Sequence, residues 1–298
     1  MDWTIFFQLT VSGCVMGVIY ALVAQSFCIT FQASKTVNFG NFEAVSLGGL
    51  ITYSALQYGW IGAVLAVIVS GCLLGVLVNK IGVEPALKKG GNNHGMWIVA
   101  TLSLGLVLKN LYELVPSWGK EERSVAPVTD AVFTIGGVTI QGQELIIIGA
   151  GLAIIVTLEL FMRLSSYGKA FAAVSNDPTT ASLVGISPKA IVIGAFAASC
   201  VLAGLSGLLA VPLTTAGAGV GIGIGLKGFS AAVLGGLNAR SNAHVVVAGL
   251  IIGISESMTA FYVDNGSGWK TAPALIFMML ILAFRPDGLF TRSQIKKV

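Results

Sequence analysis

Long apolar segments alternate with short polar stretches along nearly the whole sequence. Apolar runs of about 20 residues are typical of helices that cross a lipid bilayer. The pattern therefore predicts an all-α, polytopic membrane bundle that forms a single transmembrane domain over residues 1–298. The predicted spans are 5–30, 38–57, 60–78, 97–115, 145–162, 190–213, 229–237, 245–261 and 271–284.

One of the few long polar stretches lies near the middle of the chain, at 163–189, between two predicted spans. Gly168 and Gly185 set bends in it. Asp177 is placed to cap a second short helix whose first residue is Pro178, where a missing N–H has no cost. Two short helices joined by turns are typical of a docking element for a soluble partner, although an ordinary amphipathic connector fits the same pattern. The candidate docking face is apolar and consists of Ala172, Ala173, Leu183 and Ile186.

The helical pattern is interrupted at two other places, 38–42 and 217–228. Glycine occupies every second position from Gly217 to Gly225, and each glycine costs a helix about 1 kcal/mol relative to alanine, so we expect no stable helix there. Irregular backbone survives at membrane depth only where it is buried in protein or lines a wet cavity. We therefore expect the translocation path at these two breaks, with ordinary surface loops as the alternative.

The candidate path residues lie at or beside the two breaks. Two asparagine amides are suited to hydrogen-bonding a polar solute, and three phenylalanine rings to forming an apolar constriction. Two charges are expected to line the cavity, because a charge inside a membrane usually has a function. Helix packing for the rings and hydration at the membrane surface for the charges are the plainer alternatives. The residues are Asn38, Phe39, Asn41, Phe42, Glu43, Gly225, Lys227 and Phe229.

An internal repeat relates the two ends of the chain. The segment 42–50 aligns with 229–237 at an offset of 187 positions, and two glycines of the 60–78 span recur in the 245–261 span at an offset of 178. Five predicted crossings separate the copies, so the halves point in opposite directions, which is typical of transporters. The halves cover about 5–115 and 190–285. The offset of 187 also sets Ser12, Gly17 and Leu22 over Ser199, Gly204 and Leu209.

Composition and charge support a membrane protein and predict its orientation. Of 298 residues, 55% are hydrophobic and 10% are charged, and the mean hydropathy is +0.87, whereas soluble domains carry about a quarter charged residues. Twelve of the 17 basic residues fall in alternate loops. Because cytoplasmic loops are enriched in Lys and Arg, we expect an outside N-terminus, an odd number of crossings and a cytoplasmic C-terminus. These twelve are Lys35, Lys80, Lys88, Lys89, Arg163, Lys169, Lys189, Arg240, Arg285, Arg292, Lys296 and Lys297.

The sequence gives little support for nucleic-acid binding, metal binding or catalysis. The net charge of +4 comes from loops without basic clusters interleaved with aromatics, so no nucleic-acid partner is expected. The four cysteines and two histidines lack metal-ligand spacing, and catalytic motifs and a GxxxxGK[ST] loop are missing. We therefore expect no catalytic residue, metal or cofactor in this chain. Lys109 and Glu113 are expected to pair one turn apart, and Glu159 and Glu256 to be hydrated near span ends.

Four motifs together resemble one family. They are GVIYAL at 17–22, NFGNFE at 38–43, GKAFAAVSNDPTTASLVGI at 168–186 and RPDGLF at 285–290. Their order and their spread over nearly the whole chain resemble permeases of ABC importers of the branched-chain amino-acid (Liv) type. In that family the segment corresponding to 168–186 is the cytoplasmic loop that couples to the ATPase.

The resemblance implies a permease that forms the path for a small polar solute in a bacterial cytoplasmic (inner) membrane. It implies a related permease as heterodimer partner, two cytoplasmic ATP-binding subunits that bind the ATP, and a periplasmic or extracellular substrate-binding protein. Asn41 and Phe42 replace the family's usual small residue and glycine before Glu43. That departure leaves the solute open among branched-chain or other amino acids, urea or short amides, and small carboxylates.

Two other classes remain as alternatives at this stage. An ion-coupled secondary transporter also uses inverted repeats and broken helices, but it needs coupling carboxylates deep in the spans, and carboxylates here are few and mostly terminal. An intramembrane enzyme needs His and Asp clusters that the sequence lacks.

Overall fold

The computed structural model describes residues 3–89, 96–118, 121–238, 242–263, 266, 268–285 and 288–289. Within these residues, six helical segments are long and apolar enough to cross a membrane, and two shorter helices are also apolar. The predicted polytopic helical bundle is confirmed. The elements are α1 (Trp3–Ser34), α2 (Asn41–Ala55), η1 (Leu56–Tyr58), α3 (Gly59–Leu77), η2 (Val78–Val83), α4 (Glu84–Lys89), α5 (Met96–Leu114), β1 (Val132–Ile135), β2 (Val138–Gln141), α6 (Gly142–Leu164), α7 (Ser166–Asn176), α8 (Pro178–Leu183), α9 (Pro188–Ala210), α10 (Val220–Gly235), α11 (Asn242–Tyr262) and α12 (Ala272–Phe284).

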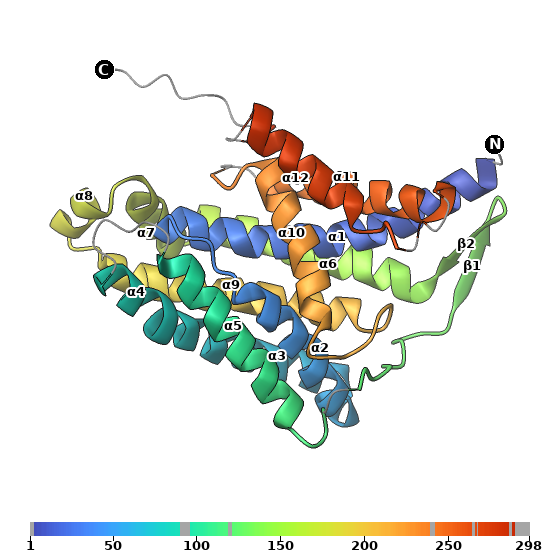
Figure 1. Ribbon diagram of the computed structural model, residues 1–298, viewed down its shortest axis with the longest axis horizontal. Helices are drawn as coiled ribbons and strands as arrows, with labels where there is room; N and C mark the ends of the chain where they lie inside the picture. Colours follow the sequence, from blue (N-terminus) through green and yellow to red (C-terminus); the bar gives the residue numbers. More distant parts are fainter. Residues whose placement is uncertain are drawn as a thin grey trace.

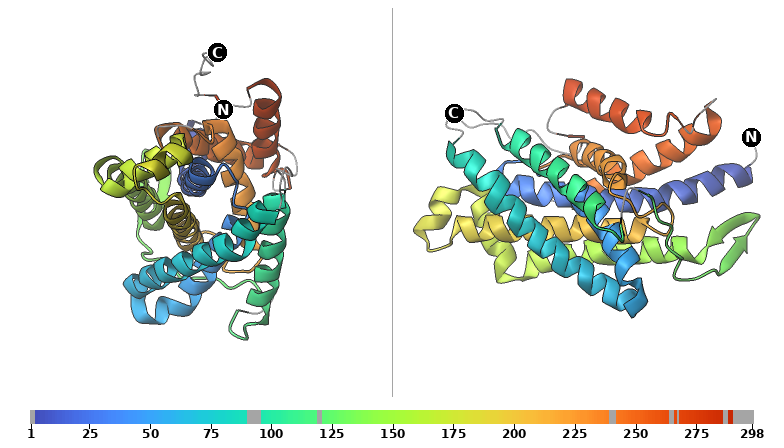
Figure 2. Two further views of the ribbon diagram at one scale, coloured as in Figure 1. Left: turned by 90° about the vertical axis from the view of Figure 1, so that its left-hand side faces the viewer. Right: turned by 60° about the horizontal axis from the view of Figure 1, so that its bottom comes forward.

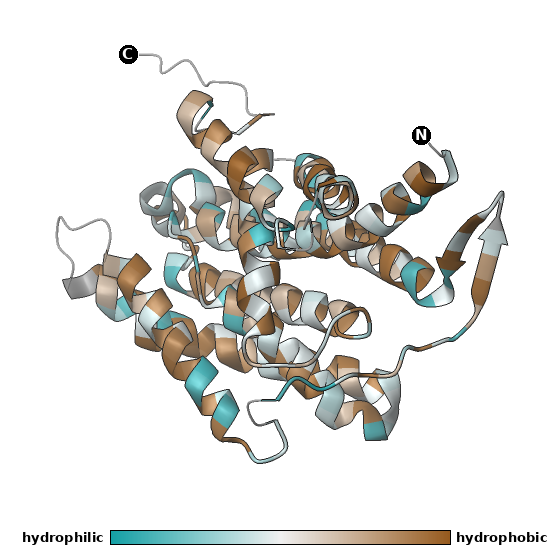
Figure 3. Ribbon diagram, turned by 45° about the vertical axis from the view of Figure 1, so that its right-hand side comes forward, coloured by the Kyte–Doolittle hydropathy of each residue, from teal (hydrophilic) through white to brown (hydrophobic). Residues whose placement is uncertain are grey.

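The long helices run along the long axis of the molecule, and α10 lies steeply across them (Figure 1). The short helices α7 and α8 lie at one end, together with α4, and the β1–β2 hairpin projects from the other end (Figure 1). Hydrophobic residues cover most of the length of the long helices (Figure 3). Several residues used in the sequence argument lie outside the described part of the chain: His94, Lys120, Arg240, Pro286, Asp287, Phe290, Arg292, Lys296 and Lys297.

Two helices form the centre of the bundle. The apolar window of α1 is 83% buried and that of α9 is 61% buried, and the end-on view shows the other helices arranged around these two (Figure 2). From Val18 to Thr30 every residue of α1 is buried. Apolarity alone does not place α1 there, since an apolar helix can also face lipid; the buried part of α1 also carries polar side chains, Gln25, Ser26 and Thr30, which need partners inside the protein.

The two halves of the chain repeat the same helix crossing. Gly249 of α11 packs against the backbone of Gly17 on α1, and Gly71 of α3 packs against the backbone of Cys200 on α9. The glycines four residues further along, Gly253 and Gly75, make the next contact in each crossing, against Gly13 and Phe196. Small residues let helix backbones approach closely, so the recurring glycines have the same packing role in both halves.

The packing register differs by one helical turn from the ungapped alignment of the first and sixth spans. That alignment sets Gly17 over Gly204. In the structure, however, Gly17 in the α1–α11 crossing corresponds to Cys200 in the α9–α3 crossing. A slide of one turn preserves the helix face that meets the neighbour. The offset of 187 therefore identifies the helix face that meets the neighbour, but it is displaced by one turn along the helix axis.

The glycine-rich segment corrects one prediction. Residues from Val220 onward are helical, with Gly219 as the N-cap, so of the predicted break 217–228 only 217–219 is irregular, as the end of the connection between α9 and α10. A Cβ at Gly221 would overlap the carbonyl of Phe42, and a Cβ at Gly225 would overlap the Phe42 ring. The close packing of α10 on α2 offsets the low helix propensity of glycine, because tertiary contacts override a propensity of this size.

The predicted hairpin after α5 is confirmed. Strands β1 and β2 pair antiparallel, with Ile135 opposite Val138, and the turn residues Gly136 and Gly137 have positive φ values of 60° and 86°. The side chain of Gln8 on α1 donates to the Thr139 carbonyl at 2.7 Å and accepts from the Thr139 N–H at 2.8 Å. The hairpin is thereby fixed to the first turns of α1.

The expected ion pair within α5 does not form. Among the described residues no salt bridge joins Lys109 to Glu113, and Lys109 instead interacts electrostatically with Glu43 on α2. Gly105, one turn before Lys109, packs over the Glu43 side chain and lets the two helices approach. The carboxylate whose charge Lys109 influences therefore lies on a neighbouring helix and not one turn away on α5.

Candidate functional site

The two breaks in the helical pattern meet in the interior of the bundle. Ser46 of α2 donates to the Ala218 carbonyl at 3.0 Å and accepts from the Gly221 N–H at 2.9 Å. Asn38 is fully buried, and Ala218 is 6% exposed. The irregular backbone that remains in the two breaks, at 38–40 and 217–219, is therefore largely buried, with Gly219 exposed, and burial in protein is the condition that the path hypothesis required.

The two asparagines of the first break are hydrogen-bonded within the chain. Asn38 Nδ2 donates to Asn41 Oδ1 at 2.8 Å, and Asn38 Oδ1 accepts from the Gly40 N–H at 3.0 Å. Asn41 in turn donates to Ser26 of α1 at 3.0 Å and accepts from Ser199 of α9 at 3.0 Å. In this conformation both amides connect the two central helices, and their role toward a solute stays a prediction.

The three phenylalanines of the predicted constriction do cluster, around a fourth that the sequence argument missed. The ring of Phe27 on α1 lies 5.8 Å from Phe42 and 5.3 Å from Phe229, and Phe39 lies 5.5 Å from Phe229. These edge-on contacts are favourable for aromatic pairs. The four rings form a continuous apolar layer between α1, α2 and α10.

A cluster of charged and polar side chains joins α1, α10 and α11. Its lysine, Lys227, lies one turn after Gly223 on α10. Lys227 Nζ is 2.6 Å from Glu256 Oε1, and the Tyr20 hydroxyl donates to Glu256 Oε2 at 2.5 Å. The Lys227 ammonium also lies 5.6 Å from the centre of the Tyr20 ring. Glu256 is only 8% exposed, so the expectation that it is hydrated at a span end is wrong.

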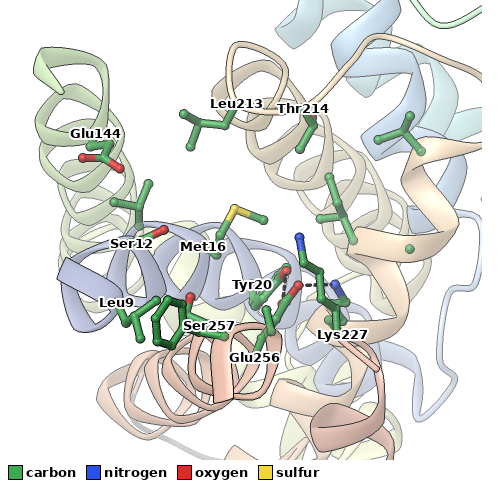
Figure 4. A pocket seen from close by; sticks show the side chains of 17 residues that line it. Leu9, Ser12, Met16, Tyr20, Glu144, Leu213, Thr214, Lys227, Glu256 and Ser257 are labelled. Carbon is green, nitrogen blue, oxygen red and sulfur yellow. Dashed lines mark hydrogen bonds and ion pairs between the residues drawn. The ribbon is translucent and has the colours of Figure 1, made fainter. Parts of the chain in front are cut away.

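A cavity of about 630 Å³ ends at this cluster. Figure 4 shows Tyr20, Lys227 and Glu256 converging on one side of it, with Glu144 and Thr214 further away on other helices. Glu144 is in the first turn of α6 and Thr214 follows α9, so the far side of the cavity lies at the hairpin end of the molecule. The remaining lining is mixed: Val15, Met16, Leu213, Val220 and Ile224 are apolar, while Ser12, Ser257 and a second lysine, Lys270, are polar.

Glu43 lies apart from this cavity. It is 3% exposed, its Oε2 atom makes no hydrogen bond within the described residues, and it does not line the cavity at Lys227. The structure thus separates the two charged residues that the sequence argument had grouped as lining one path.

The polar segment between α6 and α9 folds as predicted into two short helices. The Asp177 carboxylate caps α8, accepting from the Thr179 N–H at 2.9 Å and from the Thr180 hydroxyl, and Pro178 is the first residue of α8. Hydrogen bonds from Thr180 and then from Thr179 lower the pKa of the Asp177 carboxyl below its usual value. The cap therefore stays ionised at neutral pH and weakens only as the pH falls through that lowered pKa.

The glycines of this segment also have defined roles. Gly168 is buried, and a Cβ there would overlap the Met162 carbonyl of α6; Gly185 has a φ of 83° after α8. Both positions exclude a side chain, for steric and conformational reasons respectively. The bend expected at Gly185 is present, whereas Gly168 lies in the first turn of α7 and the chain bends before it, at Ser165.

The predicted docking face divides into two parts. Ala172 and Leu183 are exposed, and Leu183 has 82% of its surface accessible. Ala173 and Ile186 pack instead against a small internal cluster formed with Phe171 and its neighbours. Val184, 70% exposed, lies next to Leu183 and was missed, although its apolar neighbours in the sequence were a usable signal.

A bundle of membrane-crossing helices in two related halves, with buried breaks and a cavity ending at paired charges, is the architecture of a membrane transport protein. The chain belongs to the family described as branched-chain amino acid transport system / permease component, which matches residues 9–284. The resemblance carried by the four motifs is thus confirmed. The protein is a multi-pass membrane permease component.

Curated relatives cover nearly the whole chain. It is 26% identical to the high-affinity branched-chain amino acid transport system permease protein BraD of Pseudomonas aeruginosa, over 98% of both chains. It is 22% identical to the corresponding permease protein LivH of Escherichia coli K12, again over 98% of both. Among solved structures, PsaBC from Streptococcus pneumoniae in complex with Fab is similar in overall shape, with a TM-score of 0.48, 14% identity, and coverage of 96% of this chain and 94% of that chain.

Proposed function

We propose that this permease is the membrane-spanning subunit of an ATP-driven (ABC) importer that admits amino acids, with branched-chain amino acids as its first substrates. The observation that carries the proposal is the capped α7–α8 pair, presented at one end of the bundle in a chain of this family. A compact element with fixed bends can transmit movement of a bound ATPase to the spans as a rigid body.

The complete importer consists of more than this chain. A related permease pairs with it, two cytoplasmic subunits bind and hydrolyse ATP, and an extracytoplasmic binding protein delivers the solute. The permease itself contributes no catalytic residue. The curated relatives are named as permease proteins of branched-chain amino acid transport systems, which supports a system of several components.

The α7–α8 end faces the cytoplasm in a bacterial inner membrane, and the N-terminus lies outside. Support comes from charge, because Lys35 follows α1 at that end and Lys80, Lys169 and Lys189 lie in η2, α7 and the first turn of α9 at the same end. The cytoplasmic side of a membrane protein is enriched in basic residues. The cavity at Lys227 then opens toward the outside, since its far side lies at the hairpin end. The four-ring layer stands between this cavity and the cytoplasmic end of α1.

The test is uptake by the reconstituted complex. Vesicles that contain both permeases and the ATPases, with the binding protein added outside, are expected to accumulate labelled L-leucine only when ATP is present inside. The ion-coupled alternative gains some weight from the buried Glu43 and Glu256. It predicts uptake without ATP that ionophores abolish, and that result would overturn the proposal.

A further inference from the structure

The ion pair between Lys227 and Glu256 needs an explanation beyond stability. Only 12% of the Lys227 side chain and 11% of the Glu256 side chain are exposed. Removing both charges from water costs several kcal/mol each, and apolar pairs of similar size are often as stable or more so. Charges retained inside a membrane protein therefore point to function.

The internal repeat supplies a natural control for this pair. The α2–α10 offset of 187 relates Lys227 to Gly40, and the α3–α11 offset of 178 relates Glu256 to Val78. Gly40 and Val78 do meet in the other half: a Cβ on Gly40 would lie 3.2 Å from Val78 Cγ2. The two repeat-related positions thus also meet in the first half of the chain, where neither residue is charged. The fold therefore does not require the ion pair.

The pair retains hydrogen-bonding capacity toward the cavity. An ammonium has three donors, and Lys227 uses one on Glu256 and directs its charge at the Tyr20 ring. Each Glu256 oxygen has one partner, Lys227 or Tyr20, and can accept further bonds. A positive and a negative group side by side at the floor of a cavity whose walls include apolar residues such as Met16 and Leu213 match a solute that carries both charges and an apolar body.

We propose that the floor of this cavity binds the zwitterionic backbone of an amino acid. The carboxylate of the solute lies on Lys227 Nζ, its ammonium on Glu256, and its aliphatic side chain against Met16 and Leu213. This assignment rests on the proposed function and names the residues that recognise its substrate. A monoanion or a monocation leaves one member of the pair unmatched in a buried place, which selects against both.

The experiment measures protection of a cysteine in the cavity wall. Ser257, which lines the cavity beside Glu256 (Figure 4), is replaced by Ser257→Cys in a complex lacking the native cysteines, and a membrane-impermeant maleimide is added outside. We expect L-leucine to slow labelling severalfold. The same concentration of 4-methylpentanoate, which lacks the ammonium, or of 3-methylbutylamine, which lacks the carboxylate, has no such effect.

Variants separate recognition from packing. The double variant Lys227→Met, Glu256→Leu removes both charges, as the corresponding contact in the other half of the chain has none. We expect its complex to assemble, but leucine no longer to slow the labelling of Ser257→Cys. Glu256→Gln keeps the size and the Tyr20 contact, and the leucine concentration for half-protection rises about tenfold or more. The control Glu159→Gln with Arg163→Gln removes an ion pair on α6, outside the cavity lining, and leaves protection unchanged.

Two results would overturn the assignment. If the unaltered complex imports leucine but leucine gives no protection, or if the uncharged double variant keeps protection, the pair only joins α10 to α11. If the unaltered complex imports no amino acid at all, the proposed function fails and this site with it.

Discussion

Neighbouring glycines in α2 have different surroundings. A Cβ at Gly48 would overlap the Gly204 carbonyl on α9, whereas the nearest atom to a Cβ at Gly49 is Val211 Cγ2, at an ordinary 3.7 Å. In the repeated motif of α10, a Cβ at Gly235 would lie 3.0 Å from Val245 Cα, and Gly236 ends the helix with a φ of 92°. Only three of these four positions therefore require glycine, each for its own physical reason.

At the scale of single residues, Gly48→Ala is expected to destabilise the protein by about 1–3 kcal/mol, the usual cost of overpacking. Gly49→Ala is expected to be neutral or slightly stabilising, because alanine has the higher helix propensity. Thermal unfolding midpoints of the two purified variants in one detergent give the comparison. Equal midpoints would show that α2 and α9 are less closely packed than described.

The α7–α8 pair combines an anchored side with an exposed side. Phe171, Val174 and Ala181 are buried against the bundle, while Leu183 and Val184 face outward. Burial of apolar surface stabilises an interface by about 25 cal/mol per Å². The exposed pair is thus the part of this element suited to a groove on a partner.

At the scale of elements, Leu183→Glu is expected to leave the permease folded and inserted but unable to retain the ATPase subunits. Leu183→Met keeps the apolar contact and serves as the matched control. Ala173→Glu is expected to lower thermal stability as well, because Ala173 packs against the internal cluster. Co-purification and leucine-stimulated ATP hydrolysis measure the effect, and normal retention of ATPases by Leu183→Glu would remove this face from the interface.

Local signals made some elements predictable and others not. The α8 cap could be predicted because Asp177 and Pro178 act on adjacent backbone, and the spans because length and apolarity decide them. The start of α10 could not, since the Phe42 contacts that favour it come from a distant part of the chain. The Tyr20–Glu256 contact joins residues 236 positions apart, and nothing in the sequence near either residue indicates the other.

The two ends of the molecule carry different elements. Ser124 is exposed in the segment before the hairpin, and Thr179 is exposed in α8 at the opposite end. Five predicted crossings between the repeat copies invert the second half relative to the first. In the orientation proposed above, the α8 end faces the cytoplasm and the hairpin end faces outside.

At the scale of the whole molecule, Ser124→Cys is expected to react with an impermeant maleimide from outside intact cells. Thr179→Cys is expected to react only after the membrane is opened, both in a background without the native cysteines. The proportion labelled before and after permeabilisation gives the orientation. Labelling of both from the same side would contradict an inverted arrangement of the two halves.

The length of α1 has a consequence for the surrounding lipid. Its 32 residues extend about 48 Å at 1.5 Å per residue, while a bilayer's hydrocarbon core is about 30 Å thick. The rings of Trp3, Phe6 and Phe7 cluster at its N-terminal end, and aromatic residues at the end of a span anchor it among the headgroups. Because residues 17–30 of α1 are buried in the bundle, the helix cannot tilt alone, and a change in bilayer thickness must be taken up by the lipid or by the whole bundle.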